Sequence, residues 1–443
     1  MNEAKPIEID GRTGEGGGQL VRLACTLAAI TTQPIRITHV RGNRRDDSRG
    51  GGLKSQHVCS IAYLAAATDA SVTGLSVGSH TLEFRPRLPP SSLADRHVKI
   101  VADSAAASTL LIFQAILPFL LFAANSKGEP VEVDISGGTN VSWSLSYEYL
   151  DQVLLPTLEA AFCGVRVKRS IAKRGWSQGR AQRGSVSFKV WPVRLGQGLK
   201  VKKREEQGQG GPEEVTKIDV SMMVPGAMRE GLARALVHDL EELFPDVEVE
   251  FKVDEDSGAD ARIHVLLVAR SENLRWGRDI LTATPKKVAA KNKMVAVVSW
   301  NFVQSVSRKV TRELYEEVSA GGVVDEHLQD QLVVFQALAK GRTSFPSAEV
   351  EDDGGALEDR MGELEIGEGE GEKQEEKQEE KQEEKQEEKQ EERLRKDKTH
   401  EPFGEGSSHA ATARWVTAEL LPGVAWYNKG RVCEGVGMHM KKS

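Results

Sequence analysis

Cysteine is scarce in this chain, and its spacing excludes two kinds of stabilising site. The four cysteines, at positions 25, 59, 163 and 433, lie far apart and form no Cys-x-x-Cys pair. Such spacing indicates neither a zinc site nor a disulfide framework. No stretch combines the basic, apolar and small-residue zones of a secretory leader. We therefore expect an intracellular protein.

Long apolar runs are also lacking. The longest, "LLIFQAILPFLLFAA" at 110–124, falls short of the ~20 residues that a bilayer span requires and contains Gln114 and Pro118. We expect a buried helix and no membrane association. A lone amide in an apolar helix needs a hydrogen-bond partner, so Gln114 is expected to find one either in the core or on a ligand.

Excess negative charge is confined to one segment. The net charge is -7, but residues 349–400 hold 22 acidic and 10 basic side chains, which leaves the rest with 49 basic and 44 acidic residues, a balance of +5. A mildly basic body is compatible with an anionic substrate such as ATP or RNA. The acidic segment contains repeated "KQEE", which cannot bury a core, and we expect a solvated insertion over 346–400.

Glycine is plentiful, and it follows short strands. "IEID" alternates, "GRTGEGGG" turns, and apolar residues then recur at helical spacing from Leu20. The same pattern recurs in "VEVDISGGTN" and, less clearly, in "KMVAVVSW" followed by a long helix from about Asn301. These segments predict an α/β (α+β) fold of repeated β-α modules.

The stretch "GEGGGQ" at 14–19 raises the main functional question. It lacks the Gly-Lys-Ser/Thr of a P-loop, and Gln19 replaces the last glycine of a dinucleotide fingerprint. What is left is either a structural turn or a helix N-terminus whose free N–H groups meet an anion. Glu15 indicates a cation such as Mg²⁺ between carboxylate and phosphate, with helix capping as the competing interpretation. Downstream, "VRGNRRDDSRGGGLKSQH" offers arginines that bind phosphate in pairs, although a solvated loop would look similar.

Five motifs in order give the chain a specific resemblance. "DGRTGEGGGQLVR", "RGNR…GGGLKSQH", "SGGTN", "VDEHLQDQLVVFQALA" and "HAATA" together resemble the RNA 3'-terminal phosphate cyclases, in the catalytic branch and with insertions of the fungal type. The resemblance implies a repeated-module fold similar to the enolpyruvyl transferases. It places the catalytic domain at 1–184 and 301–443 and a smaller inserted α/β domain at 185–300.

The resemblance also implies an activity. A histidine takes AMP from ATP, AMP passes to an RNA 3'-phosphate, and the neighbouring 2'-hydroxyl then displaces AMP to form a 2',3'-cyclic phosphate. The implied cofactors are ATP and Mg²⁺ or Mn²⁺, and the implied partner is RNA with a 3'-phosphate end. This is ligase-class RNA processing, and the expected location is the nucleus (nucleoplasm or nucleolus) rather than the cytoplasm.

Residue by residue, the resemblance assigns His409 as the nucleophile, although a histidine that opens an apolar helix also has ordinary structural roles. Glu15 is the implied metal ligand, with Asp330 beside it. The implied nucleotide- or phosphate-binding residues are Gln19, Arg22, Arg41, Arg44, Gln56, Gln114, His327 and Gln331, and His57 is a further pocket candidate. Each has a simpler alternative, such as a solvent-facing arginine or a helix cap.

Two other functions are compatible with the same fold. A catalytically silent cyclase-like factor would bind RNA in ribosome biogenesis, but that branch lacks the nucleophile and the intact glycine motif, and both are present here as His409 and "EGGGQ". An enolpyruvyl transferase would share the fold without these motifs. The sequence therefore favours the enzyme.

Overall fold

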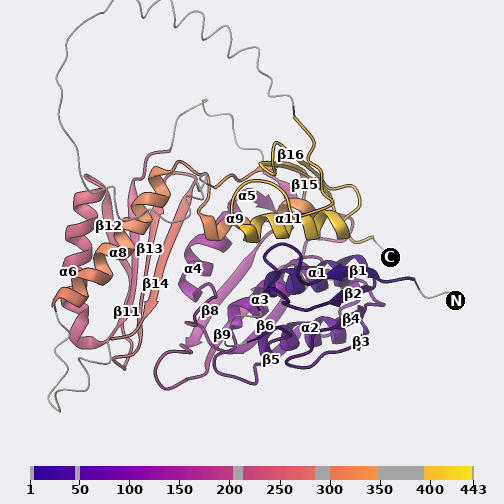
Figure 1. The fold of residues 1–443 in the computed structure, drawn as a ribbon, viewed down its shortest axis with the longest axis horizontal. Coiled ribbons are helices and arrows are strands. Elements are labelled where there is room, and N and C mark those ends of the chain that lie inside the picture. The colour runs from indigo at the N-terminus through magenta and orange to yellow at the C-terminus, as the bar shows by residue number, and fades with distance from the viewer. Residues whose placement is uncertain (1–3, 45–49, 203–212, 285–299, 348–393, 442–443) are drawn as a thin grey trace, which may run out of the picture.

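The computed structural model describes residues 4–44, 50–202, 213–284, 300–347 and 394–441 (Figure 1). Most of the acidic insertion expected at 346–400 lies outside them, as does the predicted strand "KMVAVVS" at 293–299. No helix of the described ranges is long and apolar enough to cross a membrane.

The first module is a four-stranded sheet with two helices. Its strands have the order β1-β2-β4-β3, in which β1 and β2 are parallel and the other pairs antiparallel. Helix α1 makes the crossover between the parallel strands, and α2 leads to the final hairpin. The elements are β1 (Ile7–Asp10), α1 (Gly18–Thr31), β2 (Ile35–Thr38), α2 (Ser55–Ala67), β3 (Ser71–Thr73) and β4 (Leu82–Arg85).

A second module repeats this connectivity after a short 3-10 helix, η1 (Pro90–Ser92). Its sheet has the order β5-β6-β9-β8, and again the first pair is parallel and the others antiparallel. Its elements are β5 (His97–Val101), α3 (Thr109–Leu121), β6 (Val131–Gly137), α4 (Tyr147–Tyr149), the π-helical turn η2 (Leu150–Leu154), α5 (Leu155–Ala161), β8 (Val167–Lys173) and β9 (Gly184–Val190).

A third module has the same order but is split along the chain. Its sheet runs β10-β15-β17-β16, with β10 parallel to β15, and β7 (Phe162–Cys163) pairs with the outer edge of β10. The elements are β10 (Lys200–Val201), α9 (Glu326–Leu338), β15 (Lys340–Ser344), α11 (Ser408–Leu420), β16 (Ala425–Tyr427) and β17 (Val432–Val436). One long insertion lies between β10 and α9, and the acidic insertion lies between β15 and α11.

The repeat is therefore present, but the positions that its strands occupy within the modules differ from the sequence prediction. β6, which we matched to β1, occupies the place of β2, and the counterpart of β1 is β5. The third copy is not the helix that begins near 301, because that helix packs elsewhere. A strand and then a helix occur twice in each module, so a strand followed by a helix does not by itself define which of the two positions the strand occupies.

The insertion between β10 and α9 has its own core. Its sheet has the order β12-β11-β13-β14. Helices α6 and α8 pack against each other and against this sheet (Figure 1). The elements are β11 (Lys217–Val224), α6 (Gly226–Leu243), β12 (Glu248–Asp256), β13 (Ile263–Arg270), β14 (Arg275–Thr282) and α8 (Trp300–Ser319). The sequence boundaries at 185 and 300 thus differ from the packing, since β9 belongs to the second module and α8 buries Val303, Val306, Val310 and Leu314 in the inserted core.

Helix α1 lies at the centre of the three modules. It packs against α2, α3 and α11, and its Leu20, Ala24 and Leu27 are fully buried. Burial of each large apolar side chain contributes about 1.5–3 kcal/mol. The apolar run predicted as a buried helix is α3, which Ser108 caps. The protein is a mixed α/β fold, as expected, and the N-terminus of α1 is held where helices from all three modules meet.

Candidate active site

The glycine turn between β1 and α1 packs against the start of α11. Gly14 and Gly16 have left-handed backbone angles, with φ of 63° and 60°. A Cβ on Gly14 would lie 2.2 Å from Oγ1 of Thr412, so no other residue fits there without displacement. The N–H of Glu15 donates to that same hydroxyl at 2.9 Å. The turn therefore fixes Glu15 beside the helix that carries His409.

The carboxylate of Glu15 is almost buried, with a side-chain exposure of 7%. One oxygen, Oε1, accepts a hydrogen bond from Arg44. The other, Oε2, is buried without a hydrogen-bond partner and lies 3.9 Å from Nδ1 of His409. A buried carboxylate oxygen left without a donor is costly, and it is also an available ligand for a hard cation.

His409 is the second residue of α11, whose N-cap is Ser407. Its Nδ1 donates to Oε1 of Gln19 at 3.1 Å, and its side chain is 45% exposed. Among the described residues, no hydrogen-bond partner of Nε2 is found. The ring is therefore held at Nδ1, and Nε2 is without a hydrogen-bond partner in the part of the chain that the structure describes.

Gln19 is held in turn by Asp330 of α9. The amide Nε2 of Gln19 donates to Oδ2 of Asp330, which also accepts a hydrogen bond from Nε2 of Gln331 at 2.7 Å. Burial raises the pKa of Asp330 to about 6, and the charge of His409, the amide of Gln331, the charge of Arg22 and the amide of Gln19 oppose that rise. Because a carboxylate only accepts, the Gln19 amide must direct its oxygen to His409.

A small cavity of about 50 Å³ lies next to this chain of hydrogen bonds. Its polar lining residues come from α1, α3 and α9, and they are Gln19, Arg22, Gln114, Asp330 and Gln331. Both the oxygen and the nitrogen of the Gln114 amide are buried without partners. The sequence left open whether this amide is satisfied in the core, and in the structure no core partner is found among the described residues.

Arginines make the site electropositive. Burial lowers the pKa of Arg22 to about 10, while Asp330 and Glu15 favour its charged form. No described carboxylate forms an ion pair with Arg22. Arg41 donates to the carbonyl oxygens of Gly50 and Gly52, both at 3.2 Å. The charge of Arg41 lowers the pKa of Arg22 further.

His57, the further pocket candidate, is buried at the start of α2 and accepts the N–H of Lys54 at its Nδ1. Burial, with the charges of Arg22, Arg41 and Lys54, keeps its pKa well below the usual value. It is therefore neutral. A Cβ on Gly18 would lie 2.5 Å from its Nε2, so the ring is packed against the first turn of α1.

Two of the expected residues are not joined to this group. Gln56 is partly exposed on α2, and among the described residues no hydrogen bond links it to His409 or Asp330. His327 is exposed in the first turn of α9, and its Nε2 bonds Nη1 of Arg278 at 3.1 Å. Arg278 belongs to β14 of the inserted core and also pairs with Glu317. His327 is thus placed at the junction between the inserted core and the modules.

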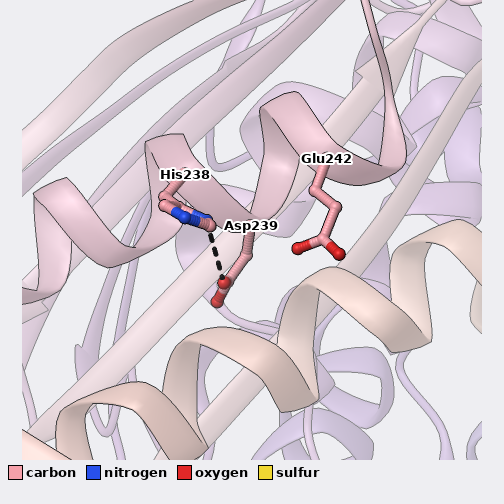
Figure 2. Close-up of side chains that lie close together, drawn as sticks. All are labelled: His238, Asp239 and Glu242. Atoms are coloured by element: carbon pink, nitrogen blue, oxygen red, sulfur yellow. Dashed lines mark ion pairs between the residues drawn. The ribbon is translucent and has the colours of Figure 1, made fainter.

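A second group of possible ligands lies elsewhere, on α6. His238, Asp239 and Glu242 project from one helix, with ligand atoms within 4.8 Å of one another (Figure 2). His238 is mostly exposed, and Asp239 already accepts a hydrogen bond from Ser307 at 2.6 Å. Glu15, Asp330 and His409 do not form so tight a group. The α6 cluster belongs to the inserted core, whereas the polar residues that line the cavity lie on α1, α3 and α9.

Sequence reasoning missed three supports of the site. Thr412 receives the Glu15 N–H, and Asn43 donates to the carbonyl oxygens of Arg12 and Gly14 at 2.7 and 3.1 Å. Arg414 is buried and donates to the carbonyl oxygens of Phe403 and Glu405, which precede His409. Thr412 lies within the "HAATA" motif, Arg414 directly follows it, and Asn43 lies within "RGNR", but the motifs alone do not show which of their residues support the turn.

Comparison with known proteins agrees with this architecture. Residues 13–354 match the family model described as RNA 3'-terminal phosphate cyclase. Proteins named RNA 3'-terminal phosphate cyclase are similar in Thermococcus kodakarensis (33% identical over 337 residues, 76% of this chain and 86% of the relative) and Methanosarcina mazei (34% over 357 residues, 78% and 90%). A third, from Pyrococcus abyssi, is 32% identical over 336 residues, 76% of this chain and 86% of the relative.

The chain belongs to the RNA 3'-terminal phosphate cyclase family. The resemblance stated from the motifs is thereby confirmed. The match to the family model ends inside the acidic insertion, so His409 lies beyond it. The assignment of His409 rests on its motif and on its contacts with Gln19 and Glu15.

Proposed function

We propose that the protein converts an RNA 3'-terminal phosphate to a 2',3'-cyclic phosphate, with ATP as co-substrate and His409 as the group that carries AMP. Family membership supports the overall reaction. The arrangement of His409, Gln19 and Asp330 supports the chemistry, because it places the ring proton on Nδ1 and leaves the lone pair of Nε2 for attack on phosphorus.

The observation that carries the proposal is the order of donors and acceptors. Asp330 accepts from the Gln19 amide, the Gln19 carbonyl accepts from Nδ1 of His409, and the proton of the neutral ring therefore resides on Nδ1. The lone pair is then on Nε2. A neutral imidazole with a free nitrogen is a good nucleophile at phosphorus near pH 7 and also a good leaving group.

Three substitutions at phosphorus complete the reaction. Nε2 of His409 forms a bond to the α-phosphorus of ATP, and the bond to pyrophosphate breaks. An oxygen of the RNA 3'-phosphate then forms a bond to that phosphorus, and the P–N bond breaks. Finally the 2'-oxygen attacks the 3'-phosphorus, loses its proton, and AMP leaves. The 2'-hydroxyl is held beside its target, so its effective concentration reaches about 10⁵–10⁸ M for well-oriented groups.

The ring acquires positive charge when Nε2 is bonded to phosphorus and Nδ1 keeps its proton. Gln19 accepts from that N–H, and the Glu15 carboxylate lies 3.9 Å away, so both stabilise the charged ring. Arg22 supplies a fixed cation at the cavity for phosphate oxygens. Arg44 is already paired with Glu15, so we assign it to holding that carboxylate.

The residues present fit a divalent cation at one position. Glu15 Oε2 is a buried carboxylate oxygen without a donor, and oxygen ligands of this kind suit Mg²⁺ or Mn²⁺. Asp330 is less available, because Oδ2 already accepts from two amides. When bound, the metal would offset negative charge on departing phosphate groups.

The test is to incubate the full chain with Mg²⁺ and ATP labelled at the α-phosphate, and to measure acid-labile label on the protein. We expect label on the wild type and on His439→Ala, which changes an exposed histidine near the C-terminus, and none on His409→Ala. RNA ending in a 3'-phosphate should then discharge the label. An unlabelled wild type across metals and nucleotides would favour the RNA-binding, catalytically silent alternative.

We also propose a nuclear location, in keeping with RNA processing. Imaging of a fluorescent fusion in cells tests it, and cytoplasmic signal alone would contradict it.

A further inference from the structure

Trp143 is held in an unusual state at the surface. The residue is 86% exposed, which is the largest exposure among the described large apolar residues. Its φ is 65°, a left-handed value that a bulky residue rarely adopts. Such a backbone costs of the order of 1–3 kcal/mol and persists only where the surroundings enforce it. Packing does not account for this residue, because the indole is not buried.

The surroundings do enforce this conformation. Thr139 and Asn140 donate their N–H groups to the carbonyl oxygen of Gly175 at 2.9 and 2.8 Å. On the other side of Trp143, the hydroxyl of Ser144 bonds that of Ser108 at 2.5 Å. The loop between β6 and α4 is therefore held by hydrogen bonds on both sides of Trp143. These bonds restrict the backbone that carries the exposed indole.

A basic loop lies beside it. Gln178, in the loop between β8 and β9, donates to Oγ of Ser142 at 3.4 Å, next to Trp143. The same loop carries Arg180 and Arg183, both exposed. Arg262 of the inserted core donates to the carbonyl oxygen of Arg180 at 2.9 Å and so holds that loop in place.

The two arginines keep their charge available. Arg183 donates to the carbonyl oxygen of Asp103 at 3.1 Å, which leaves the guanidinium charge uncompensated. In the part of the chain that the structure describes, neither Arg180 nor Arg183 forms an ion pair with a carboxylate. An exposed indole beside unpaired guanidinium groups is the combination that binds single-stranded nucleic acid, with stacking on the ring and phosphates on the cations.

This surface is close to the cavity. Ser108 caps α3, and Gln114 of the cavity lining follows six residues later in that helix. Six residues of α-helix span about 9 Å. An RNA whose 3' end occupies the cavity can therefore extend over the Trp143 loop within a few nucleotides.

We propose that Trp143, with Arg180 and Arg183, forms a binding surface for the single-stranded nucleotides that precede the 3' end of the RNA. This inference rests on the proposed function, since it takes the RNA end to the cavity. The neighbours of Trp143 are polar, namely Ser142, Ser144 and Gln178. A protein partner would instead require a contiguous apolar core around the indole, so RNA is the occupant that the chemistry favours.

The test compares binding of two 5'-labelled RNAs with 3'-phosphates, a decamer and a dinucleotide, by fluorescence anisotropy with the full chain. Trp143→Asn removes the ring but tolerates the left-handed backbone. We expect it to bind the decamer about tenfold more weakly, as loss of one stacked base implies, with the dinucleotide unaffected. Trp143→Phe should restore most of the decamer affinity.

The arginines are tested through salt dependence. The double variant Arg180→Ala/Arg183→Ala should reduce the slope of log K against log salt for the decamer by about 1.4, the loss of two phosphate contacts on a single strand. Trp300→Ala and Arg308→Ala, which change exposed side chains of α8, are the matched controls and should bind as the wild type does.

The outcomes separate this surface from the proposed function. If the wild type binds and cyclises RNA but the Trp143 and arginine variants bind the decamer equally well, the surface is wrong and the function stands. If Trp143→Asn weakens the decamer and the dinucleotide alike, the residue belongs to the terminal pocket and the surface is again wrong. A wild type that neither binds nor cyclises these RNAs overturns both.

Discussion

Gln19 separates His409 from Asp330 and bonds both: its carbonyl oxygen lies 3.1 Å from Nδ1 of His409, and its amide nitrogen donates to the carboxylate of Asp330. Because the Gln19 amide nitrogen donates to the buried carboxylate, the Gln19 carbonyl oxygen faces the histidine ring and accepts its Nδ1 hydrogen. The three residues come from α1, α9 and α11, which belong to two different modules.

Replacement of Gln19 should therefore impair His409 without removing it. In Gln19→Ala the ring loses its acceptor at Nδ1, and its nearest remaining carboxylate is 3.9 Å away. We expect the rate of His409 labelling by ATP to fall about 100-fold, the order of effect that misplacement of a reacting group produces. Rapid-quench labelling measures this rate. Gln33→Ala, which changes a residue just beyond the C-cap of α1, is the control, and equal rates for the two variants would contradict the role assigned to Gln19.

Asp330 should make the protein less stable at neutral pH than its amide variant. Burial raises the folded-state pKa of Asp330 from 3.8 to about 6, so the folded state binds its proton more tightly than the unfolded state does. Ionisation then opposes folding, and the penalty is present in full above the folded pKa. We expect Asp330→Asn to raise the free energy of unfolding at pH 7 by about 2 kcal/mol, after allowance for partial solvation.

That advantage should shrink as the pH falls from about 6 towards 3.8, because Asp330 is then protonated in the folded wild type as well. Urea unfolding of both proteins at several pH values measures the difference. A constant difference across this range would show that the pKa of Asp330 is not raised.

Gly14 should accept no side chain. A Cβ would lie 2.2 Å from Oγ1 of Thr412, and the φ of 63° adds strain. We expect Gly14→Ala to cost about 1–3 kcal/mol of stability and to slow labelling of His409. The double variant Gly14→Ala/Thr412→Ala relieves the hydroxyl clash and should recover part of the loss, which a double-mutant cycle of unfolding free energies detects. Strict additivity of the two changes would rule out the contact.

Arg414 should hold the segment before His409. Its guanidinium donates to the carbonyl oxygens of Phe403 and Glu405 at 3.3 and 2.7 Å, and burial lowers its pKa to about 10. Arg414→Met keeps much of the volume but leaves both acceptors unpaired, so we expect a loss of about 1–3 kcal/mol in stability. The rate of His409 labelling at a temperature where the variant is folded should also fall. Arg342→Met, which changes an exposed arginine on β15, is the matched control.

The sequence predicted the parts of the site that depend on local backbone chemistry. The turn at 14–18 requires glycines, and the helix that follows shows its buried face from Leu20 onward, so both could be recognised without tertiary information. The mixed α/β class followed from the same pattern. The roles of His409 and Asp330 came from the resemblance and not from spacing, because residues brought together across long loops leave no local signal.

The position of each strand within its module could not be predicted from this local pattern. β1 and β6 are both short alternating strands that precede glycine turns, although they occupy different positions in their modules. Helix α8 was misplaced for a similar reason: its apolar face identifies a helix but not the sheet that it covers. Asn43 was missed because an asparagine in a loop is ordinary at the protein surface.

The division of the third module has a consequence for the order in which the protein matures on the ribosome. Glu15 and Thr412, which bond each other, are 397 residues apart. At about 5–20 residues per second, α11 is synthesised roughly 20–80 s after the glycine turn, and only then can Thr412 bond Glu15. During that interval the first two modules and the inserted core can fold, but β10 has no parallel neighbour until β15 is made. The proposed nucleophile His409 is thus among the last site residues to be placed, because it is synthesised after nearly every other element.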